Sequence, residues 1–257
     1  MSNKLRHAKA LYLEGILEGN SREAVEKYTG DKYTQHSTGV RDGAEGFVEF
    51  FEPFIQRNPV RHIEIVRGFE DGQHVFVQAY QSLNNGESQW VTMDFFDTDG
   101  HDKIIEHWDV IEAFEGKNPS GRTQVDGEVE IIDLDRTDEN KKIVRACIEN
   151  SMMPNGDIKN AGKYISEQCI QHNRFIADGI ESYVNSFQTS EVSQQYEEIV
   201  ILIGHGNFVA TLCRVSRNGQ EFAQTDLFRL EQGKIIEHWD AAEPVPAEDE
   251  LVNSGKF

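Results

Sequence analysis

The sequence predicts an α+β fold made of two tandem domains, and three observations indicate it. Residues 103–109 and residues 234–240 both read Lys-Ile-Ile-Glu-His-Trp-Asp. Further landmarks repeat in the same order upstream of this heptapeptide. In each half, apolar residues first recur with a helical period and later alternate as in β-strands. A colinear repeat of this length is typical of a duplicated domain, and it is far longer than a solenoid repeat.

The repeated landmarks lie at an offset that changes little along the chain. The offset falls from 136 residues at Gln35 to 131 residues at Lys103, so only a few loop residues differ between the halves. The segment from residue 115 to residue 138 marks the seam, and we predict domains at residues 1–125 and 126–257. The repeated landmarks are Gln35-His36 with Gln171-His172, Asp42-Gly43 with Asp178-Gly179, Asn85-Gly86 with Asn218-Gly219, and Asp94 with Asp226.

Each domain is expected to begin with helices. Apolar residues at helical spacing predict helices over residues 8–16, 24–28 and 47–54 in the first half, and over residues 180–187 in the second. Asn20 or Ser21 is a suitable N-cap for the second of these helices. Pro53 is expected to end or kink the third helix near its C-terminus, because proline lacks a backbone N–H.

The helices are followed by segments in which apolar residues alternate, as at residues 63–65, 75–77 and 199–203. Asn85-Gly86 and Asn218-Gly219 suit a type I′ turn, because both central residues of that turn need positive φ. The repeated heptapeptide is expected to form the last strand. We therefore predict that the helices pack on one face of a curved, mainly antiparallel sheet.

Composition limits the partners and the location. No apolar run approaches the about 20 residues that span a bilayer, and residues 1–11 lack the apolar core of a signal peptide, so we expect a cytoplasmic protein. The formal net charge of −20 repels nucleic acid and anionic membranes, neither of which is an expected partner. Cys147, Cys169 and Cys213 form no motif, and we expect them to be free thiols.

Alternation along the last strand places two titratable groups on one face. Successive strand side chains point to opposite faces, so His107 shares a face with Asp109, and His238 shares one with Asp240. If these faces line the concave side of each sheet, an apolar pocket raises the aspartate pKa above about 3.9, towards that of a general base. The alternative is that these residues are solvated at a strand end.

The sequence leaves two interpretations open for each of the other polar residues. Gln35-His36 and Gln171-His172 either orient a substrate carbonyl at the mouth of the pocket or contain structural histidines. Asp94 and Asp226 lie within apolar strand segments and need a partner, either in the pocket or on a neighbouring strand.

Two further patterns concern helix capping and metal binding. Asp42 and Asp178 each begin an Asp-x-x-Glu pattern, which is expected to form a capping box at the start of the following helix. His36, His107 and Asp109 have the donor types of a two-histidine, one-carboxylate metal site. No metal-binding framework surrounds them in the sequence, and we expect no metal and no organic cofactor.

The order of these motifs resembles the SnoaL-like, or polyketide-cyclase-like, family of the nuclear-transport-factor-2-like superfamily. The resemblance covers nearly all of both halves, and the terminal heptapeptide is its most specific element. The other motifs that carry it are Tyr33-Thr-Gln-His36, Asp42-Gly43 and Asp94-x-Phe96 in the first half, and Cys169-Ile-Gln-His172, Asp178-Gly179 and Asp226-x-Phe228 in the second.

The resemblance implies two cone-shaped α+β barrels, each enclosing one pocket. Characterised members of the family include cyclases that perform an intramolecular aldol condensation without a cofactor. In them an aspartate takes a proton from an activated methylene and returns one to the carbonyl oxygen. By position this catalytic role falls to Asp109 and Asp240, with His107 and His238 beside them. The residues expected to bind substrate are Tyr33, Gln35, His36, Asp94, Gln171, His172 and Asp226.

We therefore expect a cofactor-independent acid/base enzyme of the lyase or isomerase type, acting on a small, largely apolar carbonyl compound. The alternative expectation is a non-catalytic module of the same fold that binds a small ligand or a protein. Single-domain relatives in the family commonly pair through their sheets. The resemblance therefore also implies an intrachain pseudo-dimer of the two domains, with a homodimer of the whole chain as a further option.

Overall fold

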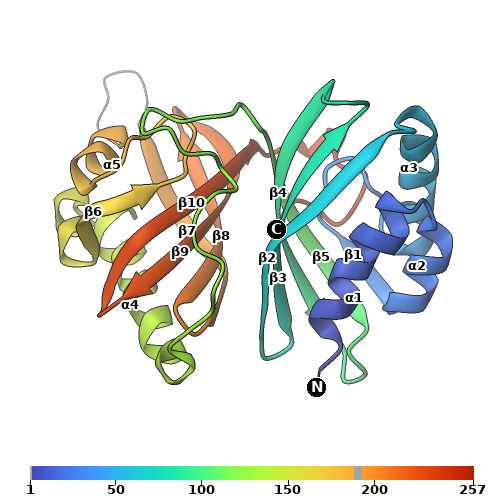
Figure 1. Ribbon diagram of the computed structural model, residues 1–257, viewed down its shortest axis with the longest axis horizontal. Helices are drawn as coiled ribbons and strands as arrows, with labels where there is room; N and C mark the ends of the chain where they lie inside the picture. The colour runs from blue at the N-terminus through green and yellow to red at the C-terminus, as the bar shows by residue number, and fades with distance from the viewer. Residues whose placement is uncertain (1, 188–192) are drawn as a thin grey trace. The chain divides into compact units, whose positions relative to one another are not determined.

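The computed structural model describes residues 2–187 and 193–257, which divide into two compact units. Unit 1 contains Met1–Ala113 and Pro246–Phe257, and unit 2 contains Phe114–Val245. Each unit has its own five-stranded sheet and its own helices (Figure 1). The predicted domains were residues 1–125 and 126–257. In the structure, the residues that follow the last strand of unit 1 belong to unit 2, and the residues that follow the last strand of unit 2 belong to unit 1. Among the described residues, no helix is long and apolar enough to cross a membrane.

Unit 1 carries helical segments and a mixed sheet in the order β1-β5-β4-β3-β2. The β1 strand is parallel to β5, and the other neighbours are antiparallel. Apolar residues of the helices pack with those of the sheet into one core. The elements are α1 (Lys4–Ala10), the π-helical η1 (Leu11–Leu17), α2 (Ser21–Tyr28), β1 (Thr29–Gln35), α3 (Gly43–Arg57), β2 (Arg61–Asp71), β3 (His74–Leu83), β4 (Ser88–Thr98) and β5 (Ile104–Ala113).

Unit 2 repeats this architecture with the strand order β6-β10-β9-β8-β7, in which β6 is parallel to β10. The predicted fold class of two tandem α+β domains with mainly antiparallel sheets is confirmed. The elements of unit 2 are η2 (Leu134–Arg136), α4 (Thr137–Ser151), η3 (Ile158–Lys163), β6 (Ile165–Gln171), α5 (Ile180–Ser186), β7 (Gln194–His205), β8 (Phe208–Arg217), β9 (Gln220–Glu231) and β10 (Lys234–Pro244), and η4 (Glu248–Glu250) belongs to unit 1.

One of the two predicted hairpin turns lies where the sequence places it. Asn218 and Gly219, with φ of 52° and 82°, join paired residues of β8 and β9. In unit 1 the backbone N–H of Gly86 donates to the carbonyl of Leu83 at 3.0 Å, so Asn84 and Asn85 are the central residues. The predicted turn was therefore one residue too late, because this loop has four residues and its glycine follows the turn.

The two helix-end predictions had different outcomes. The α3 helix does not end at Pro53 but continues to Arg57, so the alternative of a kink at Pro53 stays a prediction. Neither aspartate forms a capping box. Asp42 is the N-cap residue of α3, but its side chain accepts a hydrogen bond from the backbone of Gln35 at 2.7 Å. Asp178 likewise accepts one from the backbone of Gln171 at 2.9 Å, so both carboxylates bind the end of a strand instead.

A segment outside the sheet completes each unit. We call residues 114–131 of unit 2 the linker segment and residues 246–257 of unit 1 the C-terminal segment. The Asn118 amide of the linker segment donates to the carbonyl of Gln171 at 2.7 Å. Similarly, the Asn253 amide of the C-terminal segment donates to the carbonyl of Ser37 at 2.7 Å. Both segments therefore bind the chain where the first strand of their unit ends.

The linker segment passes so close to the sheet that it needs a glycine. Gly127 has a φ of +97°, and a Cβ atom there would meet the Glu237 carboxylate and lie 2.7 Å from the Trp239 ring. We expect Gly127→Ala to lower the free energy of unfolding by about 2–3 kcal/mol, because backbone strain and overpacking add. Urea unfolding followed by circular dichroism measures this change.

The matched control is Gly219→Ala, because Gly219 has a similar φ of +82° but open space around its Cβ position. We expect a loss of about 1 kcal/mol there, from backbone strain without the clash. Equal losses in the two variants would contradict the close packing of the linker segment.

Candidate active site

Each unit contains a cavity that the last strand of its sheet helps to line. The cavity of unit 1 has a volume of about 260 Å³, and its polar residues include Gln35, His107 and Asp109. Most of the wall is apolar and aromatic, with Phe47, Phe50, Phe51, Phe54, Trp90 and Phe96 among its residues. The predicted alternation therefore holds in unit 1, because His107 and Asp109 face the same cavity.

Behind the cavity of unit 1, His107 contacts a fully buried carboxylate. Nε2 of His107 lies 2.9 Å from Oδ1 of Asp94, and the Tyr12 hydroxyl donates to Asp94 at 2.8 Å. Nδ1 of His107 lies 2.9 Å from Oε1 of Gln35, whose amide nitrogen donates to the Tyr33 hydroxyl. With the amide in this orientation, Oε1 of Gln35 is the acceptor that faces Nδ1 of His107.

The cavity acid of unit 1 is ion-paired. Nζ of Lys256 lies 3.0 Å from Oδ1 of Asp109, and both side chains are almost fully buried. Burial by itself raises the pKa of Asp109, but the ammonium of Lys256 and the nearby His107 outweigh it and leave this pKa below its ordinary value. The expectation of a raised pKa is therefore wrong for Asp109, because the sequence does not show that a lysine 147 residues away contacts it.

Unit 2 contains the same buried contact between histidine and aspartate. Nε2 of His238 lies 3.0 Å from Oδ1 of Asp226, and its Nδ1 lies 2.9 Å from Oε1 of Gln171. The Tyr196 hydroxyl donates to Asp226 at 3.0 Å. Tyr196 belongs to β7, whereas Tyr12 belongs to η1. The tyrosine that binds the buried aspartate therefore comes from a different element in each unit.

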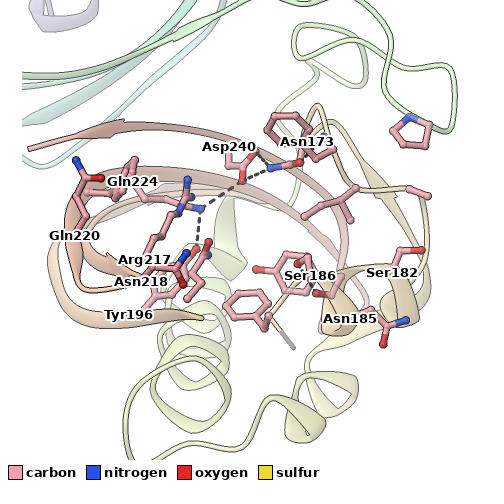
Figure 2. Close-up of a pocket in the computed structure, with 18 residues that line it drawn as sticks. Asn173, Ser182, Asn185, Ser186, Tyr196, Arg217, Asn218, Gln220, Gln224 and Asp240 are labelled. Atoms are coloured by element: carbon pink, nitrogen blue, oxygen red, sulfur yellow. Dashed lines mark hydrogen bonds between the residues drawn. The ribbon is translucent and has the colours of Figure 1, made fainter. Parts of the chain in front are cut away.

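The cavity acid of unit 2 contacts amides. Both oxygens of Asp240 accept hydrogen bonds from the Asn173 side chain, at 2.8 and 2.7 Å, and the Gln224 amide approaches at 3.4 Å (Figure 2). Burial raises the pKa of Asp240, and His238 opposes the shift only in part. Unlike Asp109, Asp240 therefore has the raised pKa that the sequence predicted.

The cavity of unit 2 is larger and more polar than that of unit 1. Its volume is about 840 Å³, and it is bounded by strands β7 to β10 and by α5 and the segment before it. The polar residues that line it, besides Asp240 and Gln224, include Asn173, Ser182, Asn185, Ser186, Tyr196, Arg217, Asn218 and Gln220 (Figure 2).

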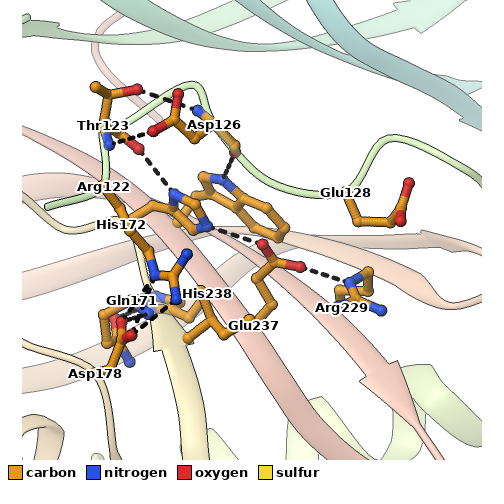
Figure 3. Close-up of polar contacts among 12 residues, drawn as sticks. Arg122, Thr123, Asp126, Glu128, Gln171, His172, Asp178, Arg229, Glu237 and His238 are labelled. Carbon is orange, nitrogen blue, oxygen red and sulfur yellow. Dashed lines mark hydrogen bonds and ion pairs between the residues drawn. The ribbon is translucent and has the colours of Figure 1, made fainter. Parts of the chain in front are cut away.

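His36 and His172 lie outside both cavities. His36 stacks on Trp108 with a centroid distance of 4.9 Å, and its Nε2 lies 2.9 Å from Glu106. His172 likewise lies 2.8 Å from Glu237, which also accepts a hydrogen bond from Arg229 (Figure 3). The expected substrate-binding role of His36 and His172 is not supported, because each follows an inward-facing glutamine and therefore points to the opposite face.

Sequence reasoning missed several site residues. Tyr12 and Tyr196 were not predicted as site residues, although a buried tyrosine hydroxyl usually has a hydrogen-bond partner. Asn173 directly follows the repeated Gln-His pair, and this position in the sequence could have indicated it. Lys256 has no such signal, because its role depends on where the C-terminal segment folds.

The clusters also have the donor types of a metal site. Asp94, His107 and Asp109 place one donor atom each within 4.8 Å of one another, and so do their counterparts in unit 2. Both nitrogens of each histidine already lie within hydrogen-bonding distance of a carboxylate and a glutamine. We therefore interpret each cluster as a hydrogen-bonded network.

The cysteines offer no nucleophile at neutral pH. Cys147, Cys169 and Cys213 are free and buried, as expected. Burial raises the pKa of the Cys147 thiol to about 12, and the other two pKa values are raised by the same cause. Since the thiolate is the reactive form, these side chains act as small apolar groups.

The opposite pKa shifts of Asp240 and Asp109 predict opposite effects of pH on stability. Because the pKa of Asp240 is raised on folding, its contribution is present below about pH 3.9 and is lost as pH rises through the folded pKa. Asp240→Asn removes that loss. We expect this variant to gain stability relative to the parent chain as pH rises from about 4 to 7, as measured by urea unfolding at each pH.

Asp109→Asn provides the comparison. The contribution of Asp109 is present above about pH 3.9 and is lost as pH falls through its lowered pKa. We expect this variant to be destabilised by about 3 kcal/mol at neutral pH, because a buried ion pair is broken. The difference should stay constant down to about pH 4 and shrink below it. The same pH dependence in both variants would refute the assigned shifts.

Comparisons with known proteins found a family model and several solved structures that are similar to parts of this chain. Residues 10–107 match the family model described as the SnoaL-like domain. Similar solved structures include a putative polyketide cyclase from Bacillus cereus, with 18% identity over 41% of this chain and 72% of that chain and a TM-score of 0.37. Another is a putative ketosteroid isomerase from Kribbella flavida, with 14% identity over 46% and 90% and a TM-score of 0.35.

A third similar structure is an epoxide hydrolase from M. tuberculosis, with 18% identity over 42% of this chain and 82% of that chain and a TM-score of 0.36. No curated protein matches the chain. The family match begins at Ala10, the last residue of α1, and covers η1, α2, α3, β1 to β4 and the part of β5 up to His107. Residues 10–107 therefore match the SnoaL-like domain family, and the second unit repeats the fold of the first.

Proposed function

We propose that the chain is a cofactor-independent acid/base enzyme that moves a proton on a small carbonyl compound. One observation carries this proposal. In both units a buried carboxylate on the cavity wall, Asp109 or Asp240, lies beside a second carboxylate that contacts a histidine. Such a group can exchange a proton with a bound molecule, and its neighbours can stabilise both protonation states.

The reaction that suits this arrangement is proton abstraction next to a carbonyl group. A carboxylate takes the proton from the carbon, and the electron pair of the C–H bond moves to the carbonyl oxygen. The protonated acid then returns its proton to that oxygen or to another carbon. Oriented hydrogen-bond donors near the carboxylate, such as Asn173 and Gln224 in unit 2, would stabilise the developing negative charge.

The two cavities favour substrates of different character. The cavity of unit 1, at about 260 Å³, is small and mostly aromatic, which suits a small, flat, apolar carbonyl compound. The cavity of unit 2, at about 840 Å³, has many amide and hydroxyl groups and suits a larger compound with polar substituents. This assignment refines the expectation, implied by the family resemblance, of a largely apolar substrate.

Loss of both cavity acids is expected to abolish the chemistry. In D₂O, the parent chain should catalyse exchange of the α-protons of enolisable ketones and β-keto esters, as measured by proton NMR. The double variant Asp109→Asn with Asp240→Asn should lose at least about 100-fold in exchange rate, because the general base is removed. Each single variant identifies the cavity that acts on a given compound.

The control for structure is circular dichroism of each variant at the assay temperature. Saturable binding of a test compound without α-proton exchange would favour the non-catalytic ligand-binding alternative. Undiminished exchange in the folded double variant would eliminate Asp109 and Asp240 as the acid/base groups.

A further inference from the structure

The linker segment and the C-terminal segment share a short motif that ends in a basic residue. The linker segment reads Asn118-Pro-Ser-Gly-Arg122, and the C-terminal segment reads Asn253-Ser-Gly-Lys256. In both segments the asparagine amide binds backbone carbonyls just beyond the first strand of the unit. The two segments thus occupy equivalent places in their units, and their basic residues can be compared directly.

The C-terminal segment is held firmly against the cavity wall of unit 1. The Asn253 amide donates to the carbonyls of Ser37 and Val40 at 2.7 and 2.8 Å, and both of these residues line the cavity. The Ser254 hydroxyl donates to Asp42 at 2.9 Å. These contacts fix the backbone immediately before Lys256.

Lys256 is buried, with 3% of its surface exposed, and its ammonium group contacts the cavity acid Asp109. Water screens a buried pair weakly, so the interaction between these charges is stronger than that of a surface ion pair. The contact therefore favours the ionised form of Asp109 and disfavours its protonation.

The basic residue of the linker segment makes a different contact. Arg122 forms hydrogen bonds with both carboxylate oxygens of Asp178, at 3.0 to 3.2 Å, and this pair is about one-third exposed (Figure 3). The cavity acid Asp240 receives the amide of Asn173 in place of a cation from the linker segment. The two segments are similar, yet in unit 1 the basic residue contacts the cavity acid and in unit 2 it contacts Asp178.

We propose that Lys256 is a positioning residue of the unit 1 cavity: its ammonium group holds Asp109 as a carboxylate, the form in which Asp109 can accept a proton from a substrate carbon. This proposal rests on the proposed function. In unit 1 the C–H bond breaks, an O–H bond forms on Asp109, and the electron pair moves to the carbonyl oxygen.

Other titratable groups surround both acids. Asp109 is near His107 on its own strand, Asp94 on β4, Tyr12 in η1 and Tyr33 on β1. The groups near Asp240 are His238, Asp226, Arg217, Tyr183 and Tyr196. The histidine and the second carboxylate occur in both units, so the chief difference between the two surroundings is the cation in direct contact with Asp109.

The test is a pH titration of the full chain labelled with ¹³C at the aspartate carboxyl carbons. Asp109→Asn and Asp240→Asn identify the two NMR resonances. We expect Asp109 to stay ionised at lower pH than Asp240. Lys256→Met should raise the titration midpoint of Asp109 by about one to three pH units, because a contacting opposite charge is removed. The midpoint of Asp240 should not change.

Two matched variants separate charge from structure. Lys256→Arg keeps the positive charge and should keep the low midpoint of Asp109, whereas Arg122→Met should leave both midpoints unchanged. If Lys256→Met does not fold, Lys256→Gln serves as the uncharged variant. An Asp109 midpoint that is the same with and without the charge at position 256 would overturn the proposal. Because this readout needs no substrate, its failure is distinct from a failure to observe α-proton exchange.

Discussion

The structure of each site depends on keeping one carboxylate in the middle of a sheet, with no access to water. Asp94 and Asp226 have no exposed surface, and a buried carboxylate without partners would be strongly destabilising. A histidine on the neighbouring strand and a tyrosine hydroxyl supply the partners in both units. The histidine is in turn fixed by a glutamine from the strand that pairs in parallel with the last strand. The parallel pairing therefore serves the site as well as the fold.

The two units differ most in what contacts the cavity acid. In unit 1 a lysine from the C-terminal segment contacts Asp109, and the pKa of Asp109 is lowered in spite of burial. In unit 2 neutral amides contact Asp240, and burial dominates, so its pKa is raised. The aspartates of the two identical heptapeptides thus have opposite pKa shifts, because residues outside the heptapeptide determine the charge around each aspartate.

Patterns in the sequence predicted the fold well because they are local. Residue periodicity and the repeated heptapeptide predicted the helices, the strands and the face shared by His107 and Asp109. The same alternation places His36 opposite to Gln35, although the sequence interpretation assigned both to the substrate. Contacts between distant residues could not be predicted in this way. Nothing near Lys256 in the sequence indicates that its segment folds against unit 1, and the polar environment of Asp109 depends on that contact.

Tyr12 and Tyr196 each bind the buried aspartate of their unit, but they lie on different elements. Tyr12 comes from a helix that precedes the sheet, and Tyr196 comes from a strand at the edge of the sheet. Both hydroxyls nevertheless bind the same buried carboxylate, at 2.8 to 3.1 Å. The physical requirement is therefore a hydroxyl donor at one point in space, and the element that supplies it is not fixed. An alignment of the two halves by sequence pairs neither tyrosine with the other, because the equivalence exists only in three dimensions.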